Sequence, residues 1–136
     1  MPDQRLLFSK CDNARYISHL DLMRTFQRAF QRAGIAIKHT EGFNPHPFVS
    51  IALPLSVGFS SKCEILEFGL LEGTAKRDVP KLLNKVMPSG ITVHKCYDAV
   101  RKVKELKYVN YIVTMEYEGG LPNGAETAVQ VLLREK

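Results

Sequence analysis

Apolar residues recur at three- and four-residue spacing between residues 19 and 33, which predicts an amphipathic helix over that stretch. Ser18 is a good N-cap for this helix because its hydroxyl accepts a hydrogen bond from a free N–H group of the first turn. Asp21 favours the positive end of the helix dipole, and Gly34 suits the left-handed conformation that ends many helices. The apolar face of the predicted helix consists of Leu22, Phe26, Ala29, Phe30 and Ala33.

Four further segments, residues 5–11, 48–53, 63–70 and 91–96, have the short, partly alternating patterns that predict strands. A second helical pattern covers residues 75–86, and the turn at 88–90 stops it. The order strand, helix, strand, strand, helix, strand is that of the ferredoxin-like fold. We therefore predict an α+β protein with a ferredoxin-like βαββαβ antiparallel sheet and two helices on one face. The other face of the sheet stays open for a partner, a second domain or a ligand.

The predicted ferredoxin-like domain covers residues 1–98. For residues 99–136 the sequence predicts a charged linker, a strand at 108–117 and a helix at 125–135. This strand and helix are the beginning of an incomplete second β-α unit. A strand and a helix alone cannot bury both of their apolar faces. We therefore expect this unit to be truncated, and to pack against the first domain or another molecule.

Composition and charge narrow the class of protein. The chain has 136 residues, 45% of them hydrophobic, without an apolar run long enough for a membrane helix or a signal peptide, so we expect a cytoplasmic protein. Its net charge of +5 and pI near 9.2 permit contact with phosphates without requiring it. The three cysteines lie far apart and read as small buried residues on strands, not as an iron–sulfur, zinc or redox site. We predict no cofactor.

The segment from His39 to Pro47 is rich in residues that restrict the backbone. Gly42 permits a positive φ, whereas Pro45 and Pro47 fix their own φ and favour extended conformations in the residues before them. Such a turn holds its side chains in nearly fixed directions, which suits a binding site. It is equally well explained as a rigid connection between the helix and the sheet.

Several basic and polar residues around this helix and turn are candidates for binding phosphate. Arginine favours bidentate contact with phosphate, and Tyr16 and Phe43 could stack on a nucleobase. The alternative is a solvated helix face on which Asp21 pairs with Arg24. The candidate phosphate-binding residues are Arg15, Arg24, Arg28, His39, Asn44 and His46, with Arg32 on the same helix stripe.

A catalytic or metal site is a second hypothesis for the same region. His19, Asp21 and His46 are candidates for acid–base catalysis, because a histidine titrates near neutral pH. His19, His39 and His46 are weak candidates for metal ligands, but their spacing matches no known metal motif. Whether the protein is an enzyme stays open at this point.

Several blocks of the sequence resemble the radical-SAM-linked protein family, a bacterial family of unknown function. The blocks are residues 15–24 (RYISHLDLMR), 28–34 (RAFQRAG), 41–47 (EGFNPHP) and 53–58 (LPLSVG), with Leu83 and residues 88–91 (PSGI). Members of that family occur alone or fused to the C-terminus of a B12-binding-type radical SAM protein, and most continue beyond the point where this chain stops. The resemblance implies a radical SAM protein as partner and a tie to RNA processing or translation. It implies no particular reaction and no catalytic residue.

These observations support three hypotheses about function. The first is a non-catalytic accessory or substrate-binding module that works with a radical SAM enzyme and binds RNA or another phosphate-bearing ligand. The second is an RNA-directed or metal-dependent enzyme that uses His19, Asp21 and His46. The third is a plain protein-interaction domain whose open sheet face binds the partner.

Overall fold

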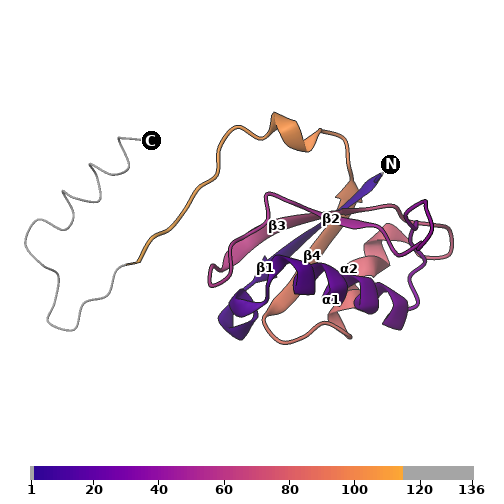
Figure 1. Cartoon of the computed structure of the whole chain (residues 1–136), viewed down its shortest axis with the longest axis horizontal. Coiled ribbons are helices and arrows are strands. Elements are labelled where there is room, and N and C mark those ends of the chain that lie inside the picture. Colours follow the sequence, from indigo (N-terminus) through magenta and orange to yellow (C-terminus); the bar gives the residue numbers. More distant parts are fainter. Residues whose placement is uncertain (1, 115–136) are drawn as a thin grey trace, which may run out of the picture. The chain divides into compact units, whose positions relative to one another are not determined.

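Four strands form one antiparallel sheet in the computed structural model, which describes residues 2–114 (Figure 1). The strands follow one another across the sheet in the order β2-β3-β1-β4, so the first strand lies in the middle of the sheet. This order and the two intervening helices confirm the predicted ferredoxin-like α+β architecture. The elements are β1 (Gln4–Lys10), α1 (His19–Arg32), β2 (Val49–Ala52), β3 (Ser61–Phe68), α2 (Val79–Asn84) and β4 (Ile91–Asp98).

Helix α1 begins and ends where the sequence predicts. Ser18 is its N-cap, and the Ser18 hydroxyl accepts a hydrogen bond of 3.2 Å from the backbone N–H of Asp21. Gly34, just beyond the helix, has a φ of +73°, a conformation that glycine adopts at little cost. The capping residues in the sequence therefore define this helix to within one residue.

The core lies between the sheet and the helices. The apolar face of α1 packs on the inner face of the sheet, where Phe26 meets the Phe8 ring at 4.8 Å and Phe30 meets the Phe68 ring at 4.9 Å between centroids. Leu83 of α2 is fully buried in the same core. Edge-on and tilted aromatic pairs of this kind stabilise a core beyond their buried area.

The second helix is shorter than its sequence pattern suggests. A 3₁₀ turn at Lys76–Asp78 precedes α2, which ends at Asn84 instead of continuing to residue 86. Pro80 lies in the first turn of α2, where its missing N–H has no consequence, and this placement favours a helix start at that point. The apolar spacing predicts the buried face correctly but overestimates the length of the helix.

The outer face of the sheet carries a partly buried ion pair. Arg5 of β1 and Glu67 of β3 lie side by side in register, with 3.1 Å between Arg5 Nε and Glu67 Oε2. Arg5 also donates a hydrogen bond to the carbonyl of Arg101, and the N–H of Ala99 donates to the carbonyl of Asp3. The segment that follows β4 therefore covers part of the face that the sequence analysis leaves open.

Residues up to 105 group with the sheet as one compact unit. The strand predicted at 108–117 is not observed at residues 108–114, which have no regular secondary structure. Its last residues and the predicted helix at 125–135 lie outside the described part of the chain. Within the described part, no helix is both long and apolar enough to cross a membrane.

Candidate functional site

A cleft opens between α1 and the turn that joins α2 to β4. Its volume is about 420 Å³. One wall is the side of α1 that carries arginines, and the other is the short segment that follows α2. The lining residues are Thr25, Arg28, Ala29, Arg32, Val86, Met87 and Pro88.

The two arginines of the cleft come from successive turns of one helix. Arg28 and Arg32 are four residues apart, so their side chains project from the same side of α1. Both are exposed, and neither forms an ion pair with another of the described residues. Two guanidinium groups without carboxylate partners leave positive charge at the cleft, a favourable environment for a phosphate.

The opposite wall of the cleft is apolar. The N–H groups of Val86 and Met87 both donate to the carbonyl of Leu83, a tightened turn that ends α2 and fixes the segment in place. Val86 and Met87 are half-buried and pack against the core. The cleft thus places cationic groups on one side and an apolar surface on the other. That combination suits a ligand with a phosphate and a less polar portion, such as a nucleotide unit.

The other two candidate arginines lie outside this cleft. The Arg15 guanidinium lies over the ring of Tyr16, 4.9 Å from its centroid, and donates to the Tyr16 hydroxyl at 2.8 Å. Arg24 forms an exposed ion pair of 3.8 Å with Asp21, the pairing that the sequence analysis weighs against phosphate binding. An exposed pair of this kind is worth little and leaves Arg24 able to exchange partners.

The segment 39–47 forms a short hairpin. His39 and Pro47 pair across it, and the N–H of Thr40 donates to the carbonyl of His46 at 2.9 Å. The His46 Nδ1 lies 3.0 Å from the carbonyl oxygen of Asn44 and 3.2 Å from Thr40 Oγ1. Local contacts within the hairpin therefore orient the exposed ring of His46.

The hairpin attaches to α1 at a different side from the cleft. Gln27 donates a hydrogen bond of 2.9 Å to the carbonyl of Pro47, and one helical residue corresponds to a rotation of about 100° from Gln27 to Arg28. None of the residues that line the cleft belongs to the hairpin. His39, Asn44 and His46 are therefore not gathered with Arg28 into the single phosphate site that the sequence suggests.

Within the described residues, the side chains proposed for catalysis or metal binding share no polar contact. No hydrogen bond or ion pair among residues 2–114 joins His19, Asp21 and His46 to one another. His39 Nδ1 instead lies 3.1 Å from the carbonyl oxygen of Ile37. In the described part of the chain, no three side chains of His, Cys, Asp or Glu come close enough to hold a metal ion.

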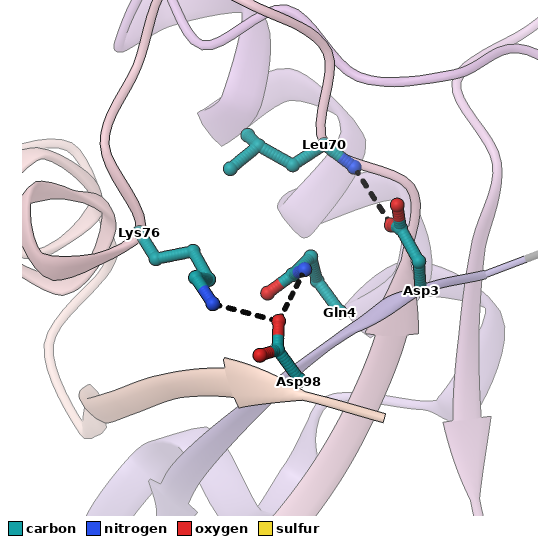
Figure 2. A network of polar contacts seen from close by, with 5 residues as sticks. All are labelled: Asp3, Gln4, Leu70, Lys76 and Asp98. Carbon is teal, nitrogen blue, oxygen red and sulfur yellow. Dashed lines mark hydrogen bonds and ion pairs between the residues drawn. The ribbon is translucent and has the colours of Figure 1, made fainter. Parts of the chain in front are cut away.

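A second polar cluster lies at the end of the sheet where β1 begins and β4 ends (Figure 2). Asp98 Oδ1 accepts from Lys76 Nζ at 2.7 Å and from Gln4 Nε2 at 2.9 Å, while Asp3 accepts from the N–H of Leu70 at 3.3 Å. These contacts join β1, β4 and the connection after β3. The Lys76 hydrogen bond, and after it the Gln4 hydrogen bond, lower the pKa of Asp98. We interpret this cluster of Asp3, Gln4, Leu70, Lys76 and Asp98, which we call the clasp, as a structural contact that holds these segments together.

The apolar half of the cleft could not be predicted from the sequence. Val86 and Met87 are visible only as the end of a helical pattern, and Pro88 only as a helix stop. No local signal says that this turn lies opposite Arg28 and Arg32. Their proximity depends on the packing of two helices on one sheet, which brings together segments that are far apart in the sequence.

Comparison with known protein families gives one finding. A family model described as "Uncharacterized protein conserved in bacteria (DUF2344)" matches residues 4–136, nearly the whole chain. A search of curated proteins finds no match to the chain.

Proposed function

The chain belongs to DUF2344, an uncharacterized protein family conserved in bacteria, and from the geometry of the cleft we propose that it is a binding module for phosphate-bearing ligands, foremost RNA. The observation that carries this proposal is the pair Arg28 and Arg32. These side chains line a cleft of about 420 Å³ and form no ion pair among the described residues. The net charge of +5 assists the approach of a polyanion.

The shape of the cleft supports RNA over a free inorganic anion. Met87 and Pro88 form a wall that a bare phosphate would leave uncovered, whereas a sugar or base would cover it. Arg24 follows the same helix stripe one turn before Arg28 and extends the positive surface beyond the cleft. A strand with successive phosphates would contact such a stripe, because each contact releases counterions.

The resemblance of the sequence to radical-SAM-linked proteins supports a further part of the proposal. In this view the module presents its bound ligand to a radical SAM protein and performs no chemistry itself. Copurification of such a partner with the tagged full chain from a bacterial host would test this part. Its failure would leave the ligand-binding proposal standing.

The direct test is a filter-binding titration of the chain with single-stranded RNA at several salt concentrations. The variant is Arg28→Ala/Arg32→Ala, and the matched control is Lys62→Ala/Arg77→Ala, which also removes two exposed charges that form no ion pair among residues 2–114. Loss of two phosphate contacts is expected to reduce the slope of log K against log[salt] by about 1.4, or about 0.7 per contact. The control should keep the wild-type slope.

Two results would contradict the proposal. One is the absence of RNA binding at low salt. The other is binding that both double variants weaken to the same extent, because binding would then follow net charge and not the cleft.

A further inference from the structure

Thr25 adds a hydroxyl-bearing side chain to the wall of the cleft that carries the two arginines. It lies on α1 one turn before Arg28, and Arg32 follows on the turn after that, so the three side chains belong to one side of the helix. The helix advances about 4.5 Å from Thr25 to Arg28. Thr25 is half-buried, whereas both arginines are exposed. The cleft therefore has a neutral polar group next to its cations.

The hydroxyl proton of Thr25 is already used within the helix. Thr25 Oγ1 donates to the carbonyl oxygen of Asp21 at 2.8 Å, and this is the side-chain hydrogen bond of Thr25 among residues 2–114. The direction of this bond is fixed because a carbonyl oxygen only accepts. A hydroxyl has one proton to donate and two lone pairs with which to accept. Towards a ligand in the cleft, Thr25 is therefore an acceptor and not a donor.

The helix also keeps this hydroxyl in a nearly constant direction. A β-branched side chain in a helix has few rotamers, and threonine favours those in which Oγ1 bonds to the carbonyl one turn earlier. The bond from Thr25 to Asp21 is of this kind. Because the acceptor is already oriented, a ligand that donates to it causes little further loss of side-chain entropy.

An acceptor beside two cations selects the kind of ligand atom that it binds. The oxygens of a phosphodiester are acceptors, so they pair with Arg28 and Arg32 and not with Thr25. Thr25 requires a donor, which in a nucleic acid is a sugar hydroxyl or an N–H group of a base. The donor nearest to a phosphate is the ribose 2′-hydroxyl, because its carbon is bonded to the carbon that carries the 3′-phosphate. DNA lacks this group.

We propose that Thr25 makes the cleft select RNA over DNA by accepting a hydrogen bond from a 2′-hydroxyl. The adjacent 3′-phosphate then lies at Arg28 and Arg32, further along the same side of α1. The sugar covers part of the apolar wall that Met87 and Pro88 form. This inference rests on the proposed binding of RNA in the cleft and adds the group by which the protein distinguishes RNA from DNA.

Fluorescence anisotropy of two labelled oligonucleotides with the full chain tests the inference. One probe is a single-stranded oligouridine RNA, and the other is the same sequence with fluorine in place of each 2′-hydroxyl. The two probes have equal charge, but fluorine cannot donate a hydrogen bond. The wild-type chain is expected to bind the RNA about two- to tenfold more tightly, which is the net effect of one hydrogen bond.

Three variants assign this preference to the Thr25 hydroxyl. Thr25→Val keeps the shape of the side chain and removes its lone pairs, so it should bind both probes with the same, weaker affinity. Thr25→Ser keeps a hydroxyl and should keep the preference for RNA. Thr92→Val is the matched control, because Thr92 is an exposed threonine on β4 and does not line the cleft. Circular dichroism checks that each variant keeps its fold.

The possible results separate this inference from the proposed function. Equal affinity of the wild-type chain for the two probes would overturn the inference and leave RNA binding by the cleft standing. A preference for RNA that Thr25→Val keeps, or that Thr92→Val loses equally, would also overturn it, because another group would then recognise the 2′-hydroxyl. If neither probe binds at low salt, the proposed function fails and the inference fails with it.

Discussion

At the scale of single residues, the three cysteines differ in how far the fold exposes them. Cys63 on β3 is exposed, whereas Cys11 and Cys96 are half-buried, so the prediction that all three are buried is wrong for Cys63. Burial raises the pKa of the Cys96 thiol to about 11, although Lys76 nearby acts in the opposite direction. The reactive form of a cysteine is the thiolate. Cys96 is therefore poorly reactive for two reasons: its thiol stays protonated, and its side chain is half-buried.

We expect an alkylating reagent at pH 8 to modify Cys63 first and to leave Cys96 almost untouched. With a pKa of about 11, only on the order of one in a thousand Cys96 thiols is ionised at that pH. Mass spectrometry of peptides from the native protein measures the order of modification. Cys63→Ser should remove the fast phase, and denaturant should let all three cysteines react. Fast labelling of Cys96 in the native chain would contradict the structure.

Asp98 gives a second residue-scale prediction, on the dependence of stability on pH. Its pKa lies below the ordinary 3.8 because Lys76 and Gln4 hydrogen-bond to the carboxylate. A carboxyl group with a lowered pKa in the folded state stabilises the fold above its ordinary pKa, and the effect is lost as the pH falls through the folded value. Asp98→Asn should therefore lower Tm at neutral pH, and the difference from wild type should shrink towards pH ~2.

The control for this prediction is Asp78→Asn. Asp78 precedes α2, makes no side-chain capping hydrogen bond and forms no ion pair among residues 2–114. Its variant should show no comparable difference in Tm that disappears in acid. A difference in Tm between Asp98→Asn and wild type that stays constant from neutral pH to acid would refute a stabilising role for the charged form of Asp98.

At the scale of elements, α1 has two functions on two faces. Its inner face holds the core together, and its outer face presents Arg24, Arg28 and Arg32. Leu20 and Leu22 lie on different faces of this helix, with exposed fractions of 55% and 4%. Replacing each of these leucines by alanine separates the contribution of core packing to the free energy of unfolding from that of helix propensity.

Leu22→Ala is expected to lower the free energy of unfolding by about 2–5 kcal/mol, since it removes buried methyl groups and leaves a cavity. Leu20→Ala should change it by less than about 0.5 kcal/mol, because the side chain is mostly in water. Urea denaturation of the two variants at the same low protein concentration measures both values. Equal effects at the two positions would contradict the orientation of α1 on the sheet.

At the scale of the whole molecule, periodicity and capping residues predict the βαββαβ order well. Ser18 and Gly34 mark the ends of α1, and alternating residues mark the strands, because these signals are local. The arrangement of Arg28 relative to His46 is not local. Arg28 lies in α1 and His46 follows shortly after it in the sequence, but the hairpin that contains His46 attaches through Gln27 to a different side of the helix. Helical phase and tertiary packing together decide that separation.

Lys10 shows a similar limit at the end of β1. Its charged side chain is almost completely buried, and Nζ donates to the carbonyl of Ile17 at 2.7 Å. Burial lowers the pKa of Lys10, and Glu64 acts in the opposite direction. A central strand is covered on both sides up to its end, and only the strand order reveals which strand is central.

That central position of β1 has a consequence for the time course of folding. Of the four strands of the sheet, β1 is synthesised first and pairs only with strands made later. Arg5 bonds to Glu67, and Gln4 bonds to Asp98, 94 residues further on. Contacts between such distant residues slow folding, because a long loop must close before they form. During synthesis the apolar face of β1 therefore stays without its sheet neighbours until β3 emerges, and β4 completes the sheet last. The contacts of Asp98 with Gln4 and Lys76 are thus among the last to form when the domain folds during synthesis.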